Sequence, residues 1–455
     1  MAAPIAASGD ALENTLVQTV LARDLTAPPA ISDAIDAEAL EGDAVTAETL
    51  PPAIAPFIRR GTAEYRRAGL ALFLAGFASF SLLYCVQPLL PDFARSFGVS
   101  PAESALALSL TTGMLAVAIL IASVFSQAWG RRGLMFGSML FGAALNLVAA
   151  MIPSWHGLLI ARAAEGLVLG GVPAVAMAWL AEEIDPAHLG KAMGLYVGGT
   201  AFGAMLGRVG MGLMTEFTSW RMALGVLGAL CLVSALGFVL LLPASRHFVP
   251  KAGFDPAFHL KAWAGHLRNR RLLRVYAIGF MLTSIFVTLF NYATFRLAGE
   301  PYGLNPTQIS LIFLCYGFGV VSSQVSGSLS DRFGRRPLLV AGFALMLAGV
   351  ALTLAAPLTL VVAGIALVTI GFFVTHSAAS GAVGPLAGTA KGHAASLYLL
   401  FYYIGSSLIG SVGGWFWSHG GWPFVCLLTG GFALAGALLS LTVPVPAKVA
   451  RPAAK

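Results

Sequence analysis

The sequence predicts an all-α membrane protein of 12 transmembrane helices, arranged as two pseudo-symmetric six-helix bundles. Three observations lead to this prediction: the composition, a series of long apolar runs, and an internal repeat. The 455 residues are 58% hydrophobic and only 10% charged, with a mean hydropathy of +0.82. Because a soluble domain carries about 25% charged residues, this composition excludes most water-soluble enzymes and nucleic-acid-binding proteins.

The first 58 residues differ sharply from the rest. They hold nine of the 20 acidic residues and a single base, Arg23. The segment is rich in Ala and Pro and poor in aromatic residues, so it cannot bury enough apolar surface to fold alone. We expect residues 1–58 to be a disordered acidic tail. They do not resemble a signal peptide, because a basic start and an apolar core are missing.

Long apolar runs with short polar breaks follow from Arg67 onward. A helix that crosses a bilayer needs about 20 mostly apolar residues, and within lipid only a helix pairs all of its backbone groups inside one segment. The predicted spans are 68–90, 104–125, 133–152, 157–181, 191–214, 220–242, 272–294, 307–329, 337–355, 358–380, 395–417 and 423–443.

These spans divide the chain into parts. We expect an N-terminal six-helix bundle over 59–242 and a C-terminal six-helix bundle over 272–443. Between them we expect a cytoplasmic linker loop, 243–271, and after them a basic cytoplasmic tail, 444–455.

Basic residues indicate how the helices are oriented. If the N-terminus lies in the cytoplasm, 21 Lys and Arg residues fall on the cytoplasmic side, and only Arg95, Arg221 and Arg296 fall on the other. Cytoplasmic loops of membrane proteins carry such an excess of positive charge. We therefore expect a multi-pass protein of the bacterial inner membrane with both termini in the cytoplasm. The basic pI of about 9.4 then reflects topology rather than nucleic-acid binding.

The two predicted bundles share an internal repeat. Trp-Gly-Arg-Arg at 129–132 follows the second span, and Phe-Gly-Arg-Arg at 333–336 follows the eighth. The fifth and eleventh spans align without gaps at an offset of 202, which pairs Gly203 with Gly405 and Trp220 with Trp422. Because six spans is an even number, both copies have the same orientation, as in transporters whose halves enclose a central cavity.

A loop motif connects these features with a known family. Residues 327–336, Gly-Ser-Leu-Ser-Asp-Arg-Phe-Gly-Arg-Arg, match the G-x-L-x-D-R-x-G-R-R signature of the major facilitator superfamily. Together with 12 spans and the repeat, the chain resembles this superfamily over about 59–443. It further resembles a YnfM-like branch, described as arabinose-efflux-permease-like or drug-efflux-like. The narrower resemblance rests on 154–157, 289–292, 371–373, 376–377, 391–392 and 395–399.

The loop motif has a physical interpretation as a conformational latch. Asp331 lies level with the start of the fifth span near Lys191, where a carboxylate favours the positive end of a helix dipole. A basic loop that only sets topology is the alternative. In the first-half copy, Ser123, Gln127 and Ala128 replace Gly, Asp and Arg, so only the second copy keeps the acidic residue. The predicted latch comprises Gly327, Asp331, Arg332, Gly334, Arg335 and Arg336.

Three charges lie deep in predicted spans: Arg162, Glu165 and Arg208. Ionisable residues at that depth are costly and are functional candidates by default. Arg162 and Glu165 are three residues apart and share a helix face. Burial disfavours the charged form of a carboxylate and a nearby arginine favours it, so this pair is our candidate for proton coupling. A static pair that locks helices together is the alternative.

The fifth span resembles the glycine-rich motif associated with antiporters, although Arg208 occupies its proline position. Its glycines permit close packing against a partner helix; those assigned to helix packing are Gly194, Gly203, Gly207 and Gly212. Arg208 is expected either to bind an anionic substrate group or to pair with Glu165. The other candidates for the substrate cavity are Tyr84, Gln87, Asn291, Tyr292, His376 and Tyr402. A packing role for the aromatic residues and an interhelical hydrogen bond for His376 are the alternatives.

The expected protein is a monomeric secondary transporter that exports a small organic solute, such as a drug or a sugar, in exchange for protons. Proton-coupled uptake is the first alternative, and a non-transporting sensor or scaffold that uses the acidic tail is the second. The expected partners are the solute, protons and the lipid bilayer, without nucleic acid. No nucleotide-binding loop, metal cluster or nucleophile motif is found in the sequence, so we expect no cofactor, no metal and no enzymatic activity.

Overall fold

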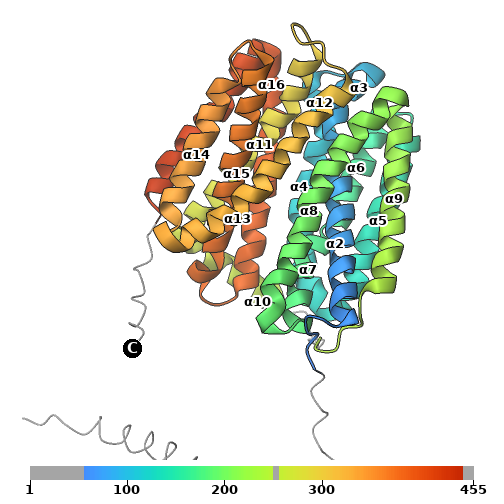
Figure 1. The fold of residues 1–455 in the computed structure, drawn as a ribbon, viewed down its shortest axis with the longest axis vertical. Coiled ribbons are helices and arrows are strands. Elements are labelled where there is room, and N and C mark those ends of the chain that lie inside the picture. The colour runs from blue at the N-terminus through green and yellow to red at the C-terminus, as the bar shows by residue number, and fades with distance from the viewer. Residues whose placement is uncertain (1–55, 249–255, 444–455) are drawn as a thin grey trace, which may run out of the picture. The chain divides into compact units, whose positions relative to one another are not determined.

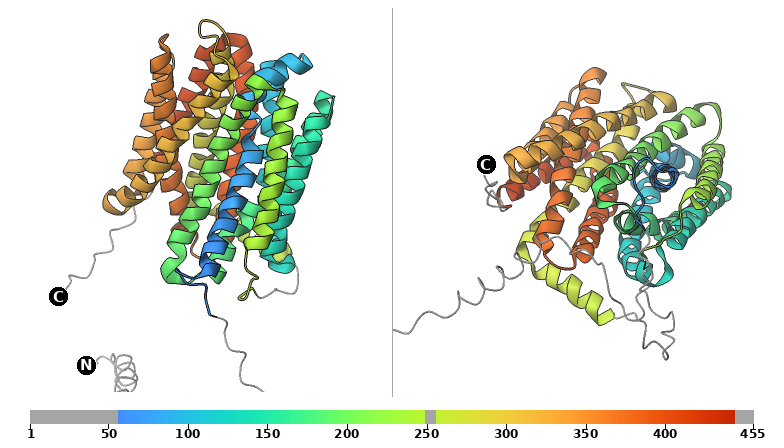
Figure 2. Two further views of the ribbon diagram at one scale, coloured as in Figure 1. Left: turned by 45° about the vertical axis from the view of Figure 1, so that its right-hand side comes forward. Right: turned by 60° about the horizontal axis from the view of Figure 1, so that its bottom comes forward.

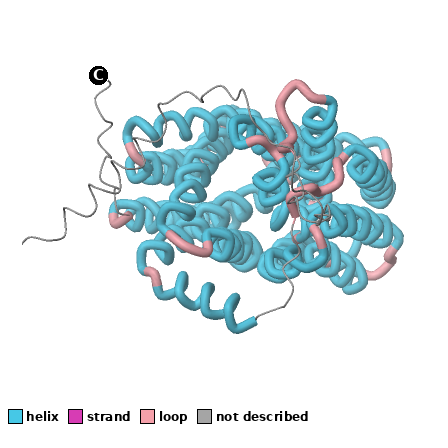
Figure 3. Tube along the Cα trace, turned by 90° about the horizontal axis from the view of Figure 1, so that it is seen from below, coloured by secondary structure: helices cyan, strands magenta, loops and turns pink. Residues whose placement is uncertain are grey.

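The computed structural model describes residues 56–248 and 256–443, apart from the side chains of 127–129 and 331. Within these ranges the ordered elements are α-helices and short 3-10 segments joined by short loops, with no strand (Figures 1 and 3). The predicted C-terminal tail lies outside the described residues, as does the N-terminal tail up to position 55. Ile58 is 2% exposed and its backbone pairs with Glu183 and Asp185, so ordered structure begins before the predicted boundary.

The first half contains helices at every predicted span. Tyr84 ends the first long helix, and a 3-10 turn, Gln87–Leu89, leads from it into a short helix. Gly170 divides the fourth predicted span into two helices. The helices are α2 (Ala63–Tyr84), α3 (Leu90–Phe97), α4 (Pro101–Trp129), α5 (Arg131–Met151), α6 (Trp155–Leu169), α7 (Gly171–Glu183), α8 (Leu189–Phe217) and α9 (Trp220–Leu241).

The second half repeats this arrangement. A 3-10 turn, Ile312–Cys315, interrupts the eighth predicted span. Gly421 has a non-helical backbone (φ 59°, ψ −148°), so the longest helix consists of two segments. The helices are α10 (Pro256–Arg268), α11 (Arg270–Ala298), α12 (Pro306–Leu311), α13 (Tyr316–Phe333), α14 (Arg335–Leu352), α15 (Leu358–Ala387) and α16 (Lys391–Leu441).

Local sequence explains where these helices start. Ser100 accepts a hydrogen bond from the backbone N–H of Glu103, whose carboxylate accepts one from the backbone N–H of Ser100. Asn305 and Gln308 form the same reciprocal pair at α12. Ser154 and Ser219 cap α6 and α9 in the simpler way. Each cap satisfies backbone N–H groups that have no partner in the first turn of a helix.

The count of 12 spans agrees with the structure. In the described ranges, ten helical segments are long and apolar enough to cross a membrane. One of them is α16, and its break at Gly421 turns it into the eleventh and twelfth predicted spans. The other predicted span outside these ten is α8, a 29-residue helix whose mean hydropathy is lowered by eight glycines and Arg208.

The two ends of the helical bundle differ. We call the end where α2 begins and α10 lies the terminal face, at the bottom of Figure 1, and the other end, with α3 and α12, the opposite face. The N-terminal half contains α2 to α9 and the C-terminal half α11 to α16. The segment predicted as a loop, 243–271, contains the helix α10, which lies across the terminal face in Figure 2. His259 of α10 lies 2.8 Å from His393 of α16, between Nδ1 and Nε2.

Candidate functional site

A cavity of about 300 Å³ lies between the two halves. Residues of α2, α7 and α8 line it from one side, and residues of α11, α13, α15 and α16 line it from the other. Nine of its 19 lining residues are Phe or Tyr, although aromatic residues make up 10% of the chain. A cavity shared by both halves is where a transporter of this architecture binds its substrate, so it is the candidate site.

The structure places the predicted cavity residues in three different positions. Tyr84, His376 and Tyr402 line the cavity. His376 also shares a hydrogen bond with the hydroxyl of Tyr398, with Nδ1 and the oxygen 3.0 Å apart. Tyr292 does not line the cavity, because its hydroxyl donates to the Gly410 carbonyl at 3.0 Å and its ring stacks on Trp417.

Arg208, Gln87 and Asn291 lie behind the cavity wall in a buried hydrogen-bonded chain. Arg208 Nε donates to Gln87 Oε1 at 2.7 Å, and Gln87 Nε2 donates to Asn291 Oδ1 at 2.7 Å. Arg208 Nη1 donates to the Ala204 carbonyl at 2.6 Å. The guanidinium carbon lies 4.1 Å from the ring centre of Tyr84 and 4.9 Å from that of Tyr316. Both rings line the cavity, so Arg208 is separated from it by one layer of side chains.

Arg162 and Glu165 form a buried ion pair within α6. Arg162 Nη1 and Glu165 Oε2 are 2.5 Å apart, and both side chains are 0% exposed. Arg208 therefore does not take Glu165 as its partner in this conformation. Glu165 Oε1 is buried and has no hydrogen-bond partner in the part of the chain that the structure describes. A buried acceptor left without a donor is costly. Glu165 Oε1 is therefore a place where an added proton would supply a missing hydrogen.

The end of α2 connects the ion pair with the cavity. Arg162 donates to the carbonyls of Leu82 and Leu83, at 3.2 and 3.0 Å, which lie in the last turn of α2. A cation there satisfies carbonyls that lack a helical partner and interacts favourably with the helix dipole. The next residue, Tyr84, lines the cavity, and Gln87 accepts from Arg208. A displacement of this segment would therefore change the hydrogen bonds of both Arg162 and Arg208.

Hydrogen bonds between the halves cluster toward the opposite face. Besides Gln87–Asn291, Ser407 Oγ donates to the Ser109 carbonyl at 2.7 Å, and Asn305 Nδ2 donates to Glu216 Oε1 at 3.1 Å. Among the described side chains, these are the hydrogen bonds recorded between the N-terminal and C-terminal halves.

Three of the four predicted packing glycines lie at close helix contacts. A Cβ added to Gly203 would come within 2.3 Å of the Phe77 carbonyl oxygen, and one on Gly207 within 2.8 Å of Ser81 Cα. On Gly212 it would come within 2.2 Å of Ser310 Cβ, in the other half. Gly194 differs, because an added Cβ would meet nothing within 4 Å, so this residue makes no close helix contact in this conformation.

The predicted latch lies at the terminal face, where α13 ends and α14 begins. Gly334 has a positive φ of 84°, which glycine adopts without strain, and it ends α13. Arg332 lies over the ring of Phe333, Arg335 lies beside Gly381, and Arg336 is half-buried. A Cβ on Gly327 would meet nothing within 4 Å, so no helix packs closely there in this conformation. The Asp331 side chain is not among those described.

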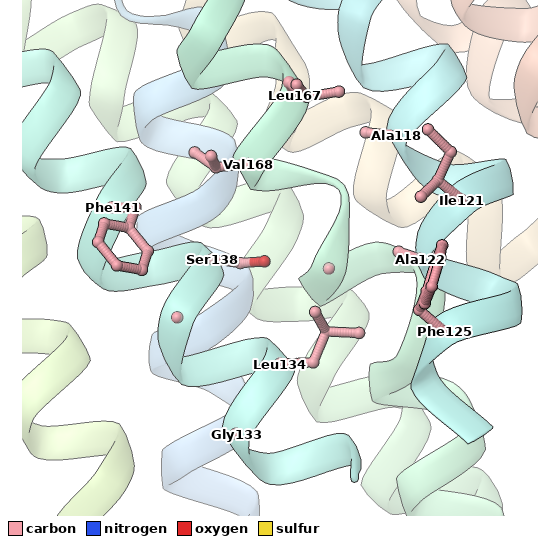
Figure 4. Close-up of a pocket in the computed structure, with 12 residues that line it drawn as sticks. Ala118, Ile121, Ala122, Phe125, Gly133, Leu134, Ser138, Phe141, Leu167 and Val168 are labelled. Atoms are coloured by element: carbon pink, nitrogen blue, oxygen red, sulfur yellow. The ribbon is translucent and has the colours of Figure 1, made fainter. Parts of the chain in front are cut away.

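A second hollow, of about 570 Å³, lies on the N-terminal half between α4, α5, α6 and α7 (Figure 4). Its wall is apolar, and Ser138 is the one polar side chain among the residues that line it. Phe141, Ile121 and Leu167 of this wall are 59%, 46% and 43% exposed, as expected of a surface that faces lipid. None of the lining residues is ionisable, so this hollow is not the candidate site despite its size.

Comparison with known proteins identifies the family. The sequence matches the Major Facilitator Superfamily over residues 72–299 and 291–455. The chain belongs to this superfamily. It is 48% identical to the inner membrane transport protein YnfM of Escherichia coli (strain K12) over 80% of this chain and 88% of that protein. It is 44% identical to an uncharacterized MFS-type transporter, YybF, of Bacillus subtilis (strain 168), over 80% and 90% of the two chains.

A solved structure shows the same fold. The nucleoside transporter NupG, crystallised as a point mutant, superposes with a TM-score of 0.69 over 83% of this chain and 99% of that one, at 14% identity. Family and fold agree, so this chain is a multi-pass membrane transporter of the major facilitator superfamily.

Sequence reasoning missed most of the cavity wall of this superfamily member. Phe80, Phe286, Tyr316, Phe372 and Phe373 line the cavity but stand in uniformly apolar runs. In such a run an aromatic residue that faces the cavity cannot be told from one that faces lipid. The predicted residues that do line the cavity all carry a polar group, which is rare inside a membrane.

Proposed function

We propose that this transporter exports a small organic solute across the bacterial inner membrane in exchange for protons, by alternating access. The observation that carries this proposal is the buried Arg162–Glu165 pair, attached to the end of α2 next to the central cavity. It is an ionisable pair, buried in the membrane-spanning part, with one carboxylate oxygen unsatisfied among the described residues.

In the proposed mechanism, Glu165 carries the proton. While Arg162 contacts Glu165, the opposite charge favours the ionised carboxylate; when the contact lengthens, burial favours the protonated form. Arg162 is held by the carbonyls of Leu82 and Leu83, so a shift of the end of α2 would move it relative to Glu165. A solute that contacts Tyr84 would act on this segment directly. Solute binding and proton binding would then exclude each other.

The proposed alternation uses the two ends of the bundle. The hydrogen bonds Ser407–Ser109 and Asn305–Glu216 hold the halves together at the opposite face in this conformation. In the other conformation, the latch at 327–336 would hold the halves together at the terminal face, with Asp331 near the start of α8. The distribution of basic residues favours a cytoplasmic terminal face, so the conformation described here would be the one that receives solute from the cell interior.

A single chain suffices for this cycle, because both walls of the cavity come from the same polypeptide. We therefore propose a monomer.

Inside-out vesicles that contain the purified protein test the proposal. The solute is one that raises the melting temperature of the protein in a thermal-shift screen. With an acidic lumen, we expect solute addition to release lumenal protons, detected by a pH-sensitive dye. Proton movement in the same direction as the solute would establish uptake by symport instead.

Glu165→Gln tests the role of the carboxylate with nearly unchanged shape. We expect the variant to keep solute binding and to lose proton release. Glu64→Gln is the matched control, because Glu64 forms a half-exposed ion pair with Arg246 at the surface. Proton release that persists in Glu165→Gln would exclude this residue as the carrier.

A further inference from the structure

The cavity wall is suited to a flat aromatic ring. Phe286 and Phe372 stack with centroids 3.9 Å apart, and Phe373 stands nearly perpendicular to Phe372, at 82° and 5.2 Å. Aromatic rings pair favourably in stacked and edge-to-face arrangements, beyond the gain from buried area. A planar ring that enters this cluster would find both kinds of partner at once.

Hydroxyl groups of the wall provide hydrogen-bond donors. Five lining residues are tyrosines: Tyr84, Tyr196, Tyr316, Tyr402 and Tyr403. Among the described residues, none of these hydroxyls has a hydrogen-bond partner. None of them is completely enclosed by protein atoms either. Buried tyrosine hydroxyls normally find a partner. These hydroxyls are therefore available to a ligand in the cavity.

The charge behind the wall is positive and not neutralised. Arg208 is 1% exposed, and its recorded partners are neutral: the Gln87 amide, the Ala204 carbonyl and the faces of aromatic rings. Its Nη2 group has no recorded acceptor in the described part of the chain. No Asp or Glu is among the 19 residues that line the cavity, and Glu165 is paired with Arg162. A buried charge without a counter-charge favours an anionic ligand.

From these three observations we infer that the transported solute is a planar aromatic monocarboxylate. This inference rests on the proposed function only in treating the cavity as the transport site. The carboxylate lies at the Tyr84 and Tyr316 hydroxyls, with the charge of Arg208 directly behind these two rings, and the ring of the solute lies against Phe286, Phe372 and Phe373. A cavity of about 300 Å³ is at the small end for ligand sites, which fits a molecule of one or two rings.

The same wall disfavours two other classes of solute. A cation would be repelled by the charge of Arg208 behind the wall and would find no carboxylate among the lining residues. A sugar would bury several hydroxyls at once, and each one left unsatisfied is costly. No Asp, Glu, Asn or Gln is among the residues that line the cavity, which leaves mainly tyrosine, threonine and serine hydroxyls and His376.

Four molecules of similar size separate the contributions of charge and ring: benzoate, benzamide, benzylamine and cyclohexanecarboxylate. Their binding to the full chain in lipid nanodiscs is measured by isothermal titration calorimetry at neutral pH, without a proton gradient. We expect benzoate to bind at least about tenfold more tightly than each of the others. Equal affinity for benzoate and benzamide would show that the negative charge of the solute is not recognised. Equal affinity for benzoate and cyclohexanecarboxylate would show that the aromatic ring is not recognised. Either result would overturn the inference.

Two variants locate the carboxylate. Arg208→Met is expected to weaken benzoate binding by about tenfold or more and to leave benzamide binding unchanged. Tyr316→Phe removes one hydroxyl without disturbing the ring, so it tests the same end if Arg208→Met fails to fold; we expect a selective loss for benzoate here too. Arg221→Met is the control, because Arg221 lies on Trp220 away from the cavity. A benzoate-to-benzamide preference that survives both substitutions would overturn the inference.

These results separate the ligand class from the transport mechanism. Binding is measured at equilibrium, so it does not depend on proton coupling or direction. If benzoate binds selectively but releases no protons in vesicles, the solute class stands and the proposed antiport fails. If a different solute drives proton release and benzoate does not bind, the antiport stands and the inferred class fails.

Discussion

Gln87 and Asn291 stand 204 positions apart in the chain and meet between the two halves, where Gln87 Nε2 donates to Asn291 Oδ1 at 2.7 Å. Matching contacts of the two halves set the offset between these segments, because Ser81 donates to the Gly203 carbonyl and Ser284 donates to the Gly405 carbonyl. Gln87 and Asn291 thus lie close to corresponding places in their halves, one position apart. The second hydrogen bond of Gln87 connects Asn291 with Arg208.

This pair leads to a prediction about stability. Gln87→Leu leaves the Asn291 oxygen without its donor and Arg208 Nε without its acceptor, and each buried group left unsatisfied costs about 1–3 kcal/mol. Adding Asn291→Leu removes one of these groups. The double variant is expected to lose less than the sum of the single losses, as measured by unfolding in detergent micelles. Gln87→Leu combined with the distant Arg221→Met should be additive. Simple additivity in both cycles would show that the pair is not coupled.

The ion pair of α6 leads to a second prediction. Arg162→Leu leaves Glu165 buried without a counter-charge, which is expected to lower stability by about 3–5 kcal/mol. In Arg162→Leu/Glu165→Leu no charge remains, so part of the loss should return. Recovery is expected to be incomplete because the carbonyls of Leu82 and Leu83 still lack a donor. Differential scanning fluorimetry compares the melting temperatures, and a double variant less stable than the single one would contradict the argument.

Gly212 leads to a prediction about conformation. A side chain at this position would collide with Ser310 of the other half, so Gly212→Leu is expected to open the opposite face. Spin labels on Phe217→Cys and Leu311→Cys would report a longer distance, since the four native cysteines are buried. Gly210→Leu is the matched control on the same helix, because nothing lies within 4 Å of its added Cβ. An unchanged distance distribution in Gly212→Leu would show that the contact does not hold this face closed.

The proposed latch leads to a fourth prediction. Asp331→Asn keeps the size of the side chain and removes the charge that favours the N-terminus of α8. We expect slower transport in vesicles with normal membrane insertion, because only the conformation closed at the terminal face would be destabilised. Wild-type transport rates at equal protein content would show that the loop only sets topology.

The membrane-spanning helices could be predicted from the sequence because the bilayer restricts both their length and their backbone conformation. Lipid requires about 20 apolar residues per crossing and leaves helix as the only state, so the spans were predictable from Arg67 onward. The details that differ have local causes. A turn begins at Gln87, Gly170 separates α6 from α7, and the linker holds α10 because its residues pack on α16 through His259 and Trp263.

The candidate site was predictable only where a charged or polar side chain interrupts an apolar run, as Tyr84 and His376 do in the cavity wall. Arg162, Glu165 and Arg208 stand out in the sequence because each is a charged residue within a long apolar run. The contact of Arg162 with Glu165 was predictable from their spacing of three residues on one helix. The partner of Arg208 was not, because Arg208 reaches Gln87 of another segment. Gly194 and Gly203 look alike in the sequence, yet only Gly203 lies against a neighbouring helix.

The sequence by itself determined the crossings, the repeat and the family, because these depend on composition and on local motifs. The tertiary structure decided which side chains share the cavity. Phe80 and Phe372 come from different halves of the chain, and each stands in an apolar run where lipid-facing and cavity-facing positions look the same. Packing of the two halves against each other distinguishes those positions, and it is this packing that places Arg208 behind a wall of aromatic rings.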